Sequence, residues 1–389
     1  MLLSFLPIMI KLRVSYIPRL MKCSWLLLVL LISNVVQAQT LQDYEMQVRD
    51  IERFGNSYFA AYTNLFSSNF GFSLNQGWQG GAIPKQAGHL SFSLVGSTAI
   101  IPINDGNRYI RMDQLYQSAN VIAAPLTPGM FTDAKGGAIS VFLLDPATNN
   151  RLVNPVTGDY LSANFNMIDG IGTGVGVTPF VMPQLSVGLG KSTELSLRVM
   201  PFAIGLNEGK VDVSAWGGAI RHNISQWFTD DEDPNFTVNL LLSYMRNKTS
   251  FTPNGERFLT FNNDYFSTAG TSLELSHHTK TQQALAFFNY RVNSFVEIYG
   301  HGGVVHQTSD LGTNGVFKLK INDAYVRDVV EETGYEYRDL FKSSINETVA
   351  AGGFGLLLGS GFVKAEVQYT YANTHIASLA LRATLLKGD

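Results

Sequence analysis

The sequence contains very little cysteine and few charged residues. A single cysteine among 389 residues means that no disulfide can form within the chain. Charged side chains make up 15% of the chain, whereas soluble domains usually carry about 25%. The 28 Lys and Arg are outnumbered by 31 Asp and Glu, and no basic block occurs. These absences exclude a disulfide-stapled scaffold and argue against a nucleic-acid partner.

Apolar and small residues are abundant instead. The composition is 45% hydrophobic and 12% aromatic, with 36 glycines and 25 phenylalanines. This apolar fraction excludes a disordered chain, because so much apolar surface will be buried somewhere. Glycine and phenylalanine with so few charges indicate strands packed against something apolar, and lipid is one candidate.

Residues 1–38 contain the features of a secretory signal peptide. An apolar stretch at 25–32 leads to the small-residue cleavage site Val36-Gln37-Ala38. Met21 is the favoured true start, and an unusually long leading segment is the alternative. Cleavage after Ala38 removes the cysteine and four basic residues, which leaves 24 basic and 31 acidic residues and a formal charge of −7.

Residues 39–85 are predicted to form an N-terminal helical segment. Tyr44, Val48, Ile51 and Phe54 recur at spacings of four, three and three, with charged residues between them. That spacing is typical of an amphipathic helix. Two interpretations remain open: a plug inside or beneath a barrel, and a helix that packs on a soluble sheet.

From Leu90 onward the apolar period becomes two, which is typical of β-strands. The segments 185–190, 195–200 and 236–245 alternate apolar residues with Ser, Thr, Asn, Gly and only an occasional charge. No segment after the signal peptide has 18 consecutive apolar residues, so no transmembrane helix is indicated. The pattern predicts an all-β protein with antiparallel pairing.

Residues 86–389 are predicted to form a transmembrane β-barrel. A closed barrel satisfies every backbone hydrogen bond in lipid, and short turns here alternate with longer connections. We expect roughly 12 strands, within a range of 10–14. Arg382, in the middle of the last strand, needs water, so its face should line a wet interior. A secreted soluble β-protein is the alternative, but its outward face should be charged.

No residue pattern predicts catalysis, a cofactor or a metal site, so a non-enzyme is expected. A Gly-x-Ser-x-Gly elbow is absent. The run Gly170–Gly176 lacks the following helix of a dinucleotide loop. His277 and His278 are adjacent and therefore point to opposite faces of a strand, as do His301 and His306, five residues apart.

Two stretches resemble an uncharacterised family of Gram-negative outer-membrane proteins. They are the segment 69–78, with Asn-Phe-Gly-Phe followed by Asn-Gln-Gly-Trp, and the segment 216–227, which begins Trp-Gly-Gly-Ala-Ile-Arg-His-Asn-Ile. The resemblance implies an outer-membrane location and a barrel preceded by an N-terminal helical segment; because the family's function is not established, it implies nothing about activity. The chain is also broadly similar to long-chain fatty-acid transporters, which place an N-terminal plug inside the barrel. One departure is the C-terminus, which lacks the final aromatic residue that the barrel assembly machinery reads.

The main hypothesis is a bacterial outer-membrane barrel that passively passes or binds small apolar molecules. The expected partners are outer-membrane lipid, the barrel assembly machinery and a small hydrophobic ligand. Aromatic residues of the N-terminal segment are predicted to line or gate the path, with mere filling of the barrel as the alternative: Phe59, Tyr62, Phe66, Phe70 and Trp78.

A second hypothesis is a structural or interaction protein whose loops recruit a surface partner. The segment 309–344 is the predicted contact, because it is long and rich in charged residues.

Overall fold

The computed structural model describes most of the chain from residue 49 to residue 386. The described part has gaps at 51, 82–83, 85, 103, 105–107, 146–147, 168, 171–175, 207–208, 229–234, 254–265, 269–271, 323–333 and 340. The predictions made for residues 1–38, including the signal peptide, lie outside the described residues.

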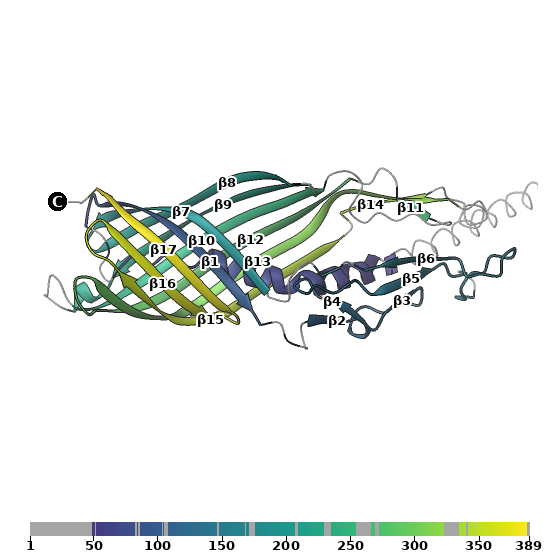
Figure 1. Cartoon of the computed structure of the whole chain (residues 1–389), viewed down its shortest axis with the longest axis horizontal. Helices are drawn as coiled ribbons and strands as arrows, with labels where there is room; N and C mark the ends of the chain where they lie inside the picture. Colours follow the sequence, from purple (N-terminus) through teal and green to yellow (C-terminus); the bar gives the residue numbers. More distant parts are fainter. Residues whose placement is uncertain are drawn as a thin grey trace, which may run out of the picture.

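The described strands close into an antiparallel barrel of ten strands (Figure 1). Closure comes from the first and last strands, which pair over their whole length, with Leu94 opposite Leu381. The all-β expectation is confirmed, and ten strands fall at the lower end of the predicted range. The barrel strands are β1 (Leu90–Ile101), β7 (Gly176–Gly190), β8 (Thr193–Leu206), β9 (Gly209–Asn223), β10 (Phe236–Pro253), β12 (Ser272–Arg291), β13 (Val296–Ile321), β15 (Lys342–Leu358), β16 (Val363–Tyr371) and β17 (His375–Leu386).

The two faces of the barrel wall differ as the alternation predicts. On β8, Leu197 and Val199 point outward and are about half exposed, whereas Ser196 and Arg198 point inward and are buried. Exposed aromatic side chains lie at both ends of the outer apolar belt, including Phe236 and Tyr371. An apolar outer belt with aromatic residues at its edges and a polar interior is the architecture of an outer-membrane barrel. No described helix is long and apolar enough to cross a membrane.

The barrel has two unlike ends. At the turn end, three connections are short: β7–β8, β12–β13 and β15–β16. At the opposite end, which we call the loop end, several strands are extended. Strands β10, β12 and β13 are 18, 20 and 26 residues long, whereas about 9–11 residues suffice to span a bilayer. These strands therefore extend beyond the membrane, and β11 (Phe266–Thr268) and β14 (Gly334–Arg338) pair with the extended part of β13. The expectation of a loop over 309–344 is wrong for its described part, which is mostly strand.

Described residues between β1 and β7 form two small sheets beyond the loop end (Figure 1). One sheet contains β2 (Tyr109–Arg111) and β4 (Leu126–Pro128), with the short 3₁₀ helix η1 (Met112–Gln114) after β2. The other contains β3 (Val121–Ala123), β5 (Ala138–Phe142) and β6 (Ser162–Asn166). A second 3₁₀ helix, η2 (Ser225–Trp227), lies between β9 and β10. We call the segment 108–167 the inserted sheets.

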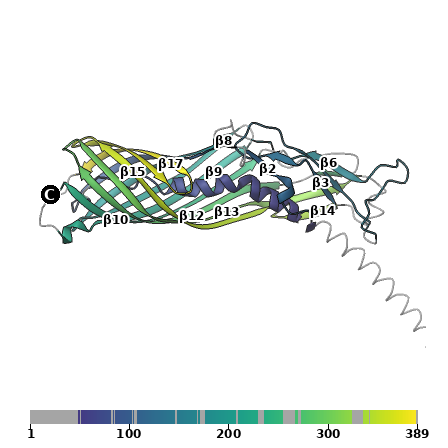
Figure 2. The same ribbon diagram turned by 90° about the horizontal axis from the view of Figure 1, so that it is seen from below.

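The N-terminal helix, described at residues 49–50 and 52–74, runs along the barrel axis from the inserted sheets into the lumen (Figure 2). Its first half packs on the inserted sheets through Phe54, Tyr58 and Tyr62, which contact buried Met112 and Ile139. Its second half lies inside the barrel, where Phe70 joins the central core cluster. The predicted helix is thus present, and its lower half occupies the lumen as a plug does.

Candidate functional site

The lumen is occupied by the end of the helix and by residues 75–81, which we call the plug segment. Side chains from several strands hold this stretch at successive depths. Gln307 Nε2 donates to the Ser68 carbonyl at 2.6 Å, and Ser97 Oγ donates to the Ser73 carbonyl at 2.6 Å. Nearer the turn end, Arg382 Nη2 donates to the Gly77 carbonyl at 3.1 Å. The chain inside the barrel is therefore attached through wall side chains rather than through a backbone ladder.

Two glycines allow the backbone to lie so close to the wall. A Cβ at Gly71 would overlap the end of the Gln307 side chain, so any larger residue there would require that side chain to move. Gly77 lies three residues beyond the end of the helix and has φ +70°, a left-handed conformation, and a Cβ there would lie 2.6 Å from Val95 Cγ1. Such a conformation costs glycine little. The Phe-Gly and Gln-Gly motifs of the sequence thus mark close approaches to the wall.

At the turn end, two buried ion pairs grip the plug segment, and we call these four residues the latch. Arg382 pairs with Glu366 at 2.7 Å, and Arg221 pairs with Glu194 at 3.0 Å. All four side chains are at most 4% exposed. Each arginine also donates to the plug segment: Arg382 to the Gln79 carbonyl, and Arg221 to the Gln79 side-chain oxygen at 2.9 Å. The latch therefore ties β8, β9, β16 and β17 to the plug.

The latch buries four charged side chains and pairs most of their polar atoms, although Arg221 Nε is buried without a hydrogen-bond partner among the described residues. Removing an ion pair from water costs several kcal/mol per ion, and only good geometry with further hydrogen bonds compensates for it. The Glu366 carboxylate accepts a further hydrogen bond besides that of Arg382, because Tyr299 Oη donates to Glu366 Oε1 at 2.6 Å. Plug carbonyls accept further arginine N–H groups: those of Gly77 and Gln79 from Arg382, and that of Gly81 from Arg221. The latch and the plug segment are consequently interdependent.

A third arginine packs on the plug aromatic ring. The Arg198 guanidinium lies 3.7 Å from the centre of the Trp78 ring and donates twice to Gln184 Oε1. Trp78 Nε1 donates to Asn75 Oδ1 at 2.6 Å. A desolvated cation over a tryptophan face is worth about 2 kcal/mol. Trp78 and Arg198 are both about 2% exposed, so this level of the lumen is filled.

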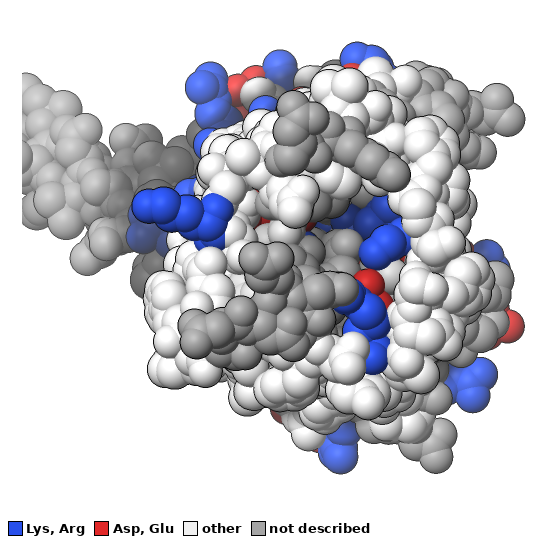
Figure 3. All heavy atoms as spheres, turned by 90° about the vertical axis from the view of Figure 1, so that its left-hand side faces the viewer, with Lys and Arg blue, Asp and Glu red and all other residues white. Residues whose placement is uncertain are grey.

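Seen from the turn end, charged side chains gather in the hollow centre of a largely uncharged ring (Figure 3). The Lys364–Glu297 pair, 3.4 Å apart and partly exposed, belongs to this end. Both signs of charge are present at this end, since each of the three ion pairs joins a cation to a carboxylate.

Above the latch, the lumen contains a layer of aromatic rings. Phe66 stacks on Phe70 with ring centres 5.3 Å apart, and Phe70 meets Phe180 edge to face at 5.7 Å. Both helix rings lie within 5.4 Å of the His277 ring, which points inward from β12. This layer could accommodate an apolar molecule only if rings moved.

The five aromatic residues predicted to line a path lie along this axis but do not form one surface. Phe66 and Phe70 are in the aromatic layer, and Trp78 is at the latch. Phe59 lies higher and stacks on Phe341 at 5.2 Å. Tyr62 packs on the inserted sheets and donates to the Asp169 carbonyl at 2.7 Å. Burial there raises the pKa of Tyr62 to about 12.

The sequence interpretation missed most of the latch. It identified Arg382 as facing the interior, which is correct, but it expected water as its partner rather than Glu366 and the plug. Glu194, Arg198 and Arg221 occupy the same inward positions of their strands. A search for charges at alternating positions of apolar strands would have found them. Among the described residues, no three His, Cys, Asp or Glu side chains gather closely enough to hold a metal ion.

Comparison with protein families identifies the family of the chain. It belongs to the family of unknown function DUF6588, whose model matches residues 18–385. No curated protein matches it.

Several solved barrels are similar at low sequence identity. The translocator domain of the autotransporter NalP from Neisseria meningitidis shares 12% identity, with a TM-score of 0.31, over 84% of this chain and 97% of that one. The outer membrane protease OmpT from Escherichia coli shares 9% identity, with a TM-score of 0.31, over 77% and 97%. A FadL homologue from Pseudomonas aeruginosa shares 9% identity, with a TM-score of 0.22, over 77% and 90%.

Proposed function

We propose that this member of the family is a plugged channel that passes small, predominantly apolar molecules when the plug segment is released. The observation that carries the proposal is the attachment of residues 77–81 to the wall by side-chain hydrogen bonds of Arg221 and Arg382. A segment held in this way can leave without breaking any strand pairing of the barrel.

Release of the plug segment would open a path whose aromatic lining suits an apolar solute. The aromatic layer of Phe66, Phe70 and Phe180 lies on the loop side of the latch. Outer-membrane barrels carry their short turns on the periplasmic side, so a solute entering at the loop end would meet the aromatic layer first and the latch last. The latch then serves as the inner gate.

Uptake by liposomes tests this function. The double variant Arg221→Gln with Arg382→Gln removes both arginines of the latch. We expect it to admit a small aromatic solute into protein-containing liposomes at least tenfold faster than the parent chain. The control is Lys191→Gln, an exposed position on the β7–β8 turn at the same end. Heat-modifiable mobility on gels confirms that each variant is folded. Equal, negligible uptake by folded variant and parent would refute the proposal and leave the plug as filling.

The inserted sheets favour a second candidate function, the recruitment of a surface partner. They expose Ile122 (47%), Leu126 (52%) and Tyr160 (53%) outside the membrane barrel. Large apolar side chains that are exposed outside the membrane barrel are candidates for contact with a partner. Val156, in the connection before β6, is 90% exposed.

Photo-crosslinking in intact cells tests this candidate. A photoreactive amino acid at Val156 should give a discrete protein adduct, whereas one at Lys191 on the opposite end should not. Identical adduct patterns at the two positions, or none at either, would remove the idea.

A further inference from the structure

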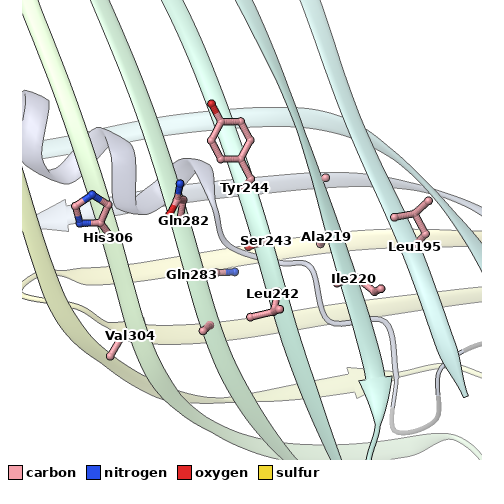
Figure 4. A pocket seen from close by; sticks show the side chains of 12 residues that line it. Leu195, Ala219, Ile220, Leu242, Ser243, Tyr244, Gln282, Gln283, Val304 and His306 are labelled. Carbon is pink, nitrogen blue, oxygen red and sulfur yellow. The ribbon is translucent and has the colours of Figure 1, made fainter.

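A hollow of about 550 Å³ lies on the lipid-facing side of the barrel wall, across β8, β9, β10, β12 and β13 (Figure 4). It exists because two outward positions carry little side chain. Gly218 on β9 and Ala284 on β12 are flanked by the larger Leu242, Tyr244 and Val304. The hollow is independent of the plug and latch, which lie on the other side of the wall.

The strand register arranges the residues around the hollow in rows. The lower row is apolar, with Leu242 opposite both Ile220 and Ala284. The next row toward the loop end is mixed, with Tyr244 opposite both Gly218 and Gln282. Tyrosine and polar side chains at this level mark the edge of the hydrocarbon region. The hollow therefore spans the boundary between acyl chains and headgroups.

The row directly above is cationic. Arg246 lies opposite Lys280 on the neighbouring strand, and Trp216 lies on the other side of Arg246. Both cationic side chains are exposed. Rows on one face of a strand are about 7 Å apart, which is within the reach of an Arg or Lys side chain.

This pair of cations has no acidic partner. Like charges directly opposite each other destabilise a sheet. Within the described residues, no carboxylate comes within ion-pair distance of Arg246 or Lys280. The nearest acid in the next row, Asp310, accepts a hydrogen bond from Ser344 Oγ at 2.7 Å. The arrangement calls for an external anion at the level of the headgroups.

We propose that this part of the wall is a binding site for an anionic membrane lipid. Arg246 and Lys280 hold its headgroup phosphate, and an acyl chain fills the hollow beside Gly218 and Ala284. Charge complementarity selects the anion, since Arg and Lys are the residues that bind phosphate. The adjoining apolar hollow selects a lipid rather than a free ion. Trp216 and Tyr244, whose ring centres are 5.5 Å apart, form the aromatic edge of the site.

Lipid retention by the full chain in detergent tests the charge. The protein is offered phosphatidylglycerol and, separately, phosphatidylcholine, and native mass spectrometry counts the lipid molecules that remain bound to each protein molecule. The parent chain should retain phosphatidylglycerol preferentially, and Arg246→Gln with Lys280→Gln should weaken that retention roughly tenfold. The control variant, Lys210→Gln with Lys342→Gln, removes two exposed charges from other rows and should bind as the parent does. Equal losses in both double variants would overturn the proposal, because they would indicate a general charge effect.

A second variant tests the hollow. Gly218→Leu fills it from the lipid side, and it is compatible with the fold because a Cβ there meets its nearest neighbours at an ordinary 3.5 Å. It should reduce phosphatidylglycerol retention several-fold while leaving the cations in place. Inorganic phosphate, added as competitor at equal concentration, should displace little lipid. Full displacement by phosphate, together with no effect of Gly218→Leu, would show a bare anion site and refute the lipid assignment.

Discussion

The N-terminal helix and the plug segment that follows it are held at their two ends by different kinds of interaction. At the loop end, Phe54 and Tyr58 are buried against Met112 and other apolar residues of the inserted sheets. At the turn end, buried arginines donate to the plug segment and to Glu194 and Glu366. Apolar packing tolerates small shifts, whereas buried ion pairs fail when one partner is lost.

This difference indicates which end can act as a gate. Charge-assisted hydrogen bonds are short and geometrically specific, so we expect the latch to be released abruptly. The apolar attachment loosens gradually. We therefore expect the loop end to anchor the helix and the turn end to control passage.

The largest effect is expected from breaking one latch pair. Arg382→Met leaves Glu366 buried without its cation, and loss of one partner of a buried pair costs about 3–5 kcal/mol. Unfolding in urea, followed by loss of heat-modifiable mobility on gels, measures the change.

The matched control removes both partners. Arg382→Met with Glu366→Leu leaves no unpaired charge and should recover most of the lost stability. If the double variant is as unstable as the single one, the ion pair is not what holds this end.

A smaller, local effect is expected at the loop end. Phe54→Ala removes a buried ring from the cluster on the inserted sheets, and such truncations cost about 3 kcal/mol or more in a full core. Because only one attachment weakens, amide exchange should accelerate over helix residues 52–62 while strand β12 stays protected. Hydrogen exchange by mass spectrometry measures both. Uniform acceleration across the barrel would contradict independent attachment of the two ends.

A pH-dependent effect is expected where the inserted sheets meet the chain before β7. The Gly136 backbone N–H and the Lys135 ammonium, 2.7 Å from the carboxylate, hold the pKa of Asp169 below its usual 3.8. A lowered pKa means that this contact contributes fully above the unfolded-state value and is lost as pH falls through the folded-state value.

Exchange of the Gly136 amide, corrected for intrinsic rates, measures this loss. It should be slow from pH 7 to pH 4 and should accelerate below that. Asp169→Asn should abolish the pH dependence. A pH-independent parent profile would contradict the assignment.

The smallest effect is expected at the exposed pair on the strand extensions. Lys318 and Glu336 lie 2.8 Å apart and are about half exposed, and such pairs contribute little to stability. Glu336→Gln should leave both urea unfolding and solute uptake unchanged. A measurable loss of either would mean that the extensions support the barrel more than their exposure indicates.

Much of the wall could be predicted from the sequence, because the alternation of a membrane strand follows directly from its two solvents. Leu197 beside Arg198 predicts one lipid face and one polar face, and both are observed. The helix followed from its spacing of apolar residues. These features depend on local sequence alone.

The latch and the strand extensions could not be predicted in the same way. Pairing Arg382 with Glu366, or Arg221 with Glu194, requires the register of neighbouring strands, which the sequence does not display. The extension of β13 was not predicted because most of its outward residues beyond Val304 are polar or glycine, a composition typical of a loop. The cationic row likewise becomes visible only when Arg246 and Lys280 are placed opposite each other.

Conductance across a planar bilayer tests the central claim, that the latch closes the lumen, most directly. The parent chain should give no steady ion conductance, because Trp78, Arg198 and the latch fill the lumen at one level. Folded Arg221→Gln with Arg382→Gln should give discrete open steps. Steady conductance through the parent chain, unchanged in the variant, would contradict a lumen closed by the latch.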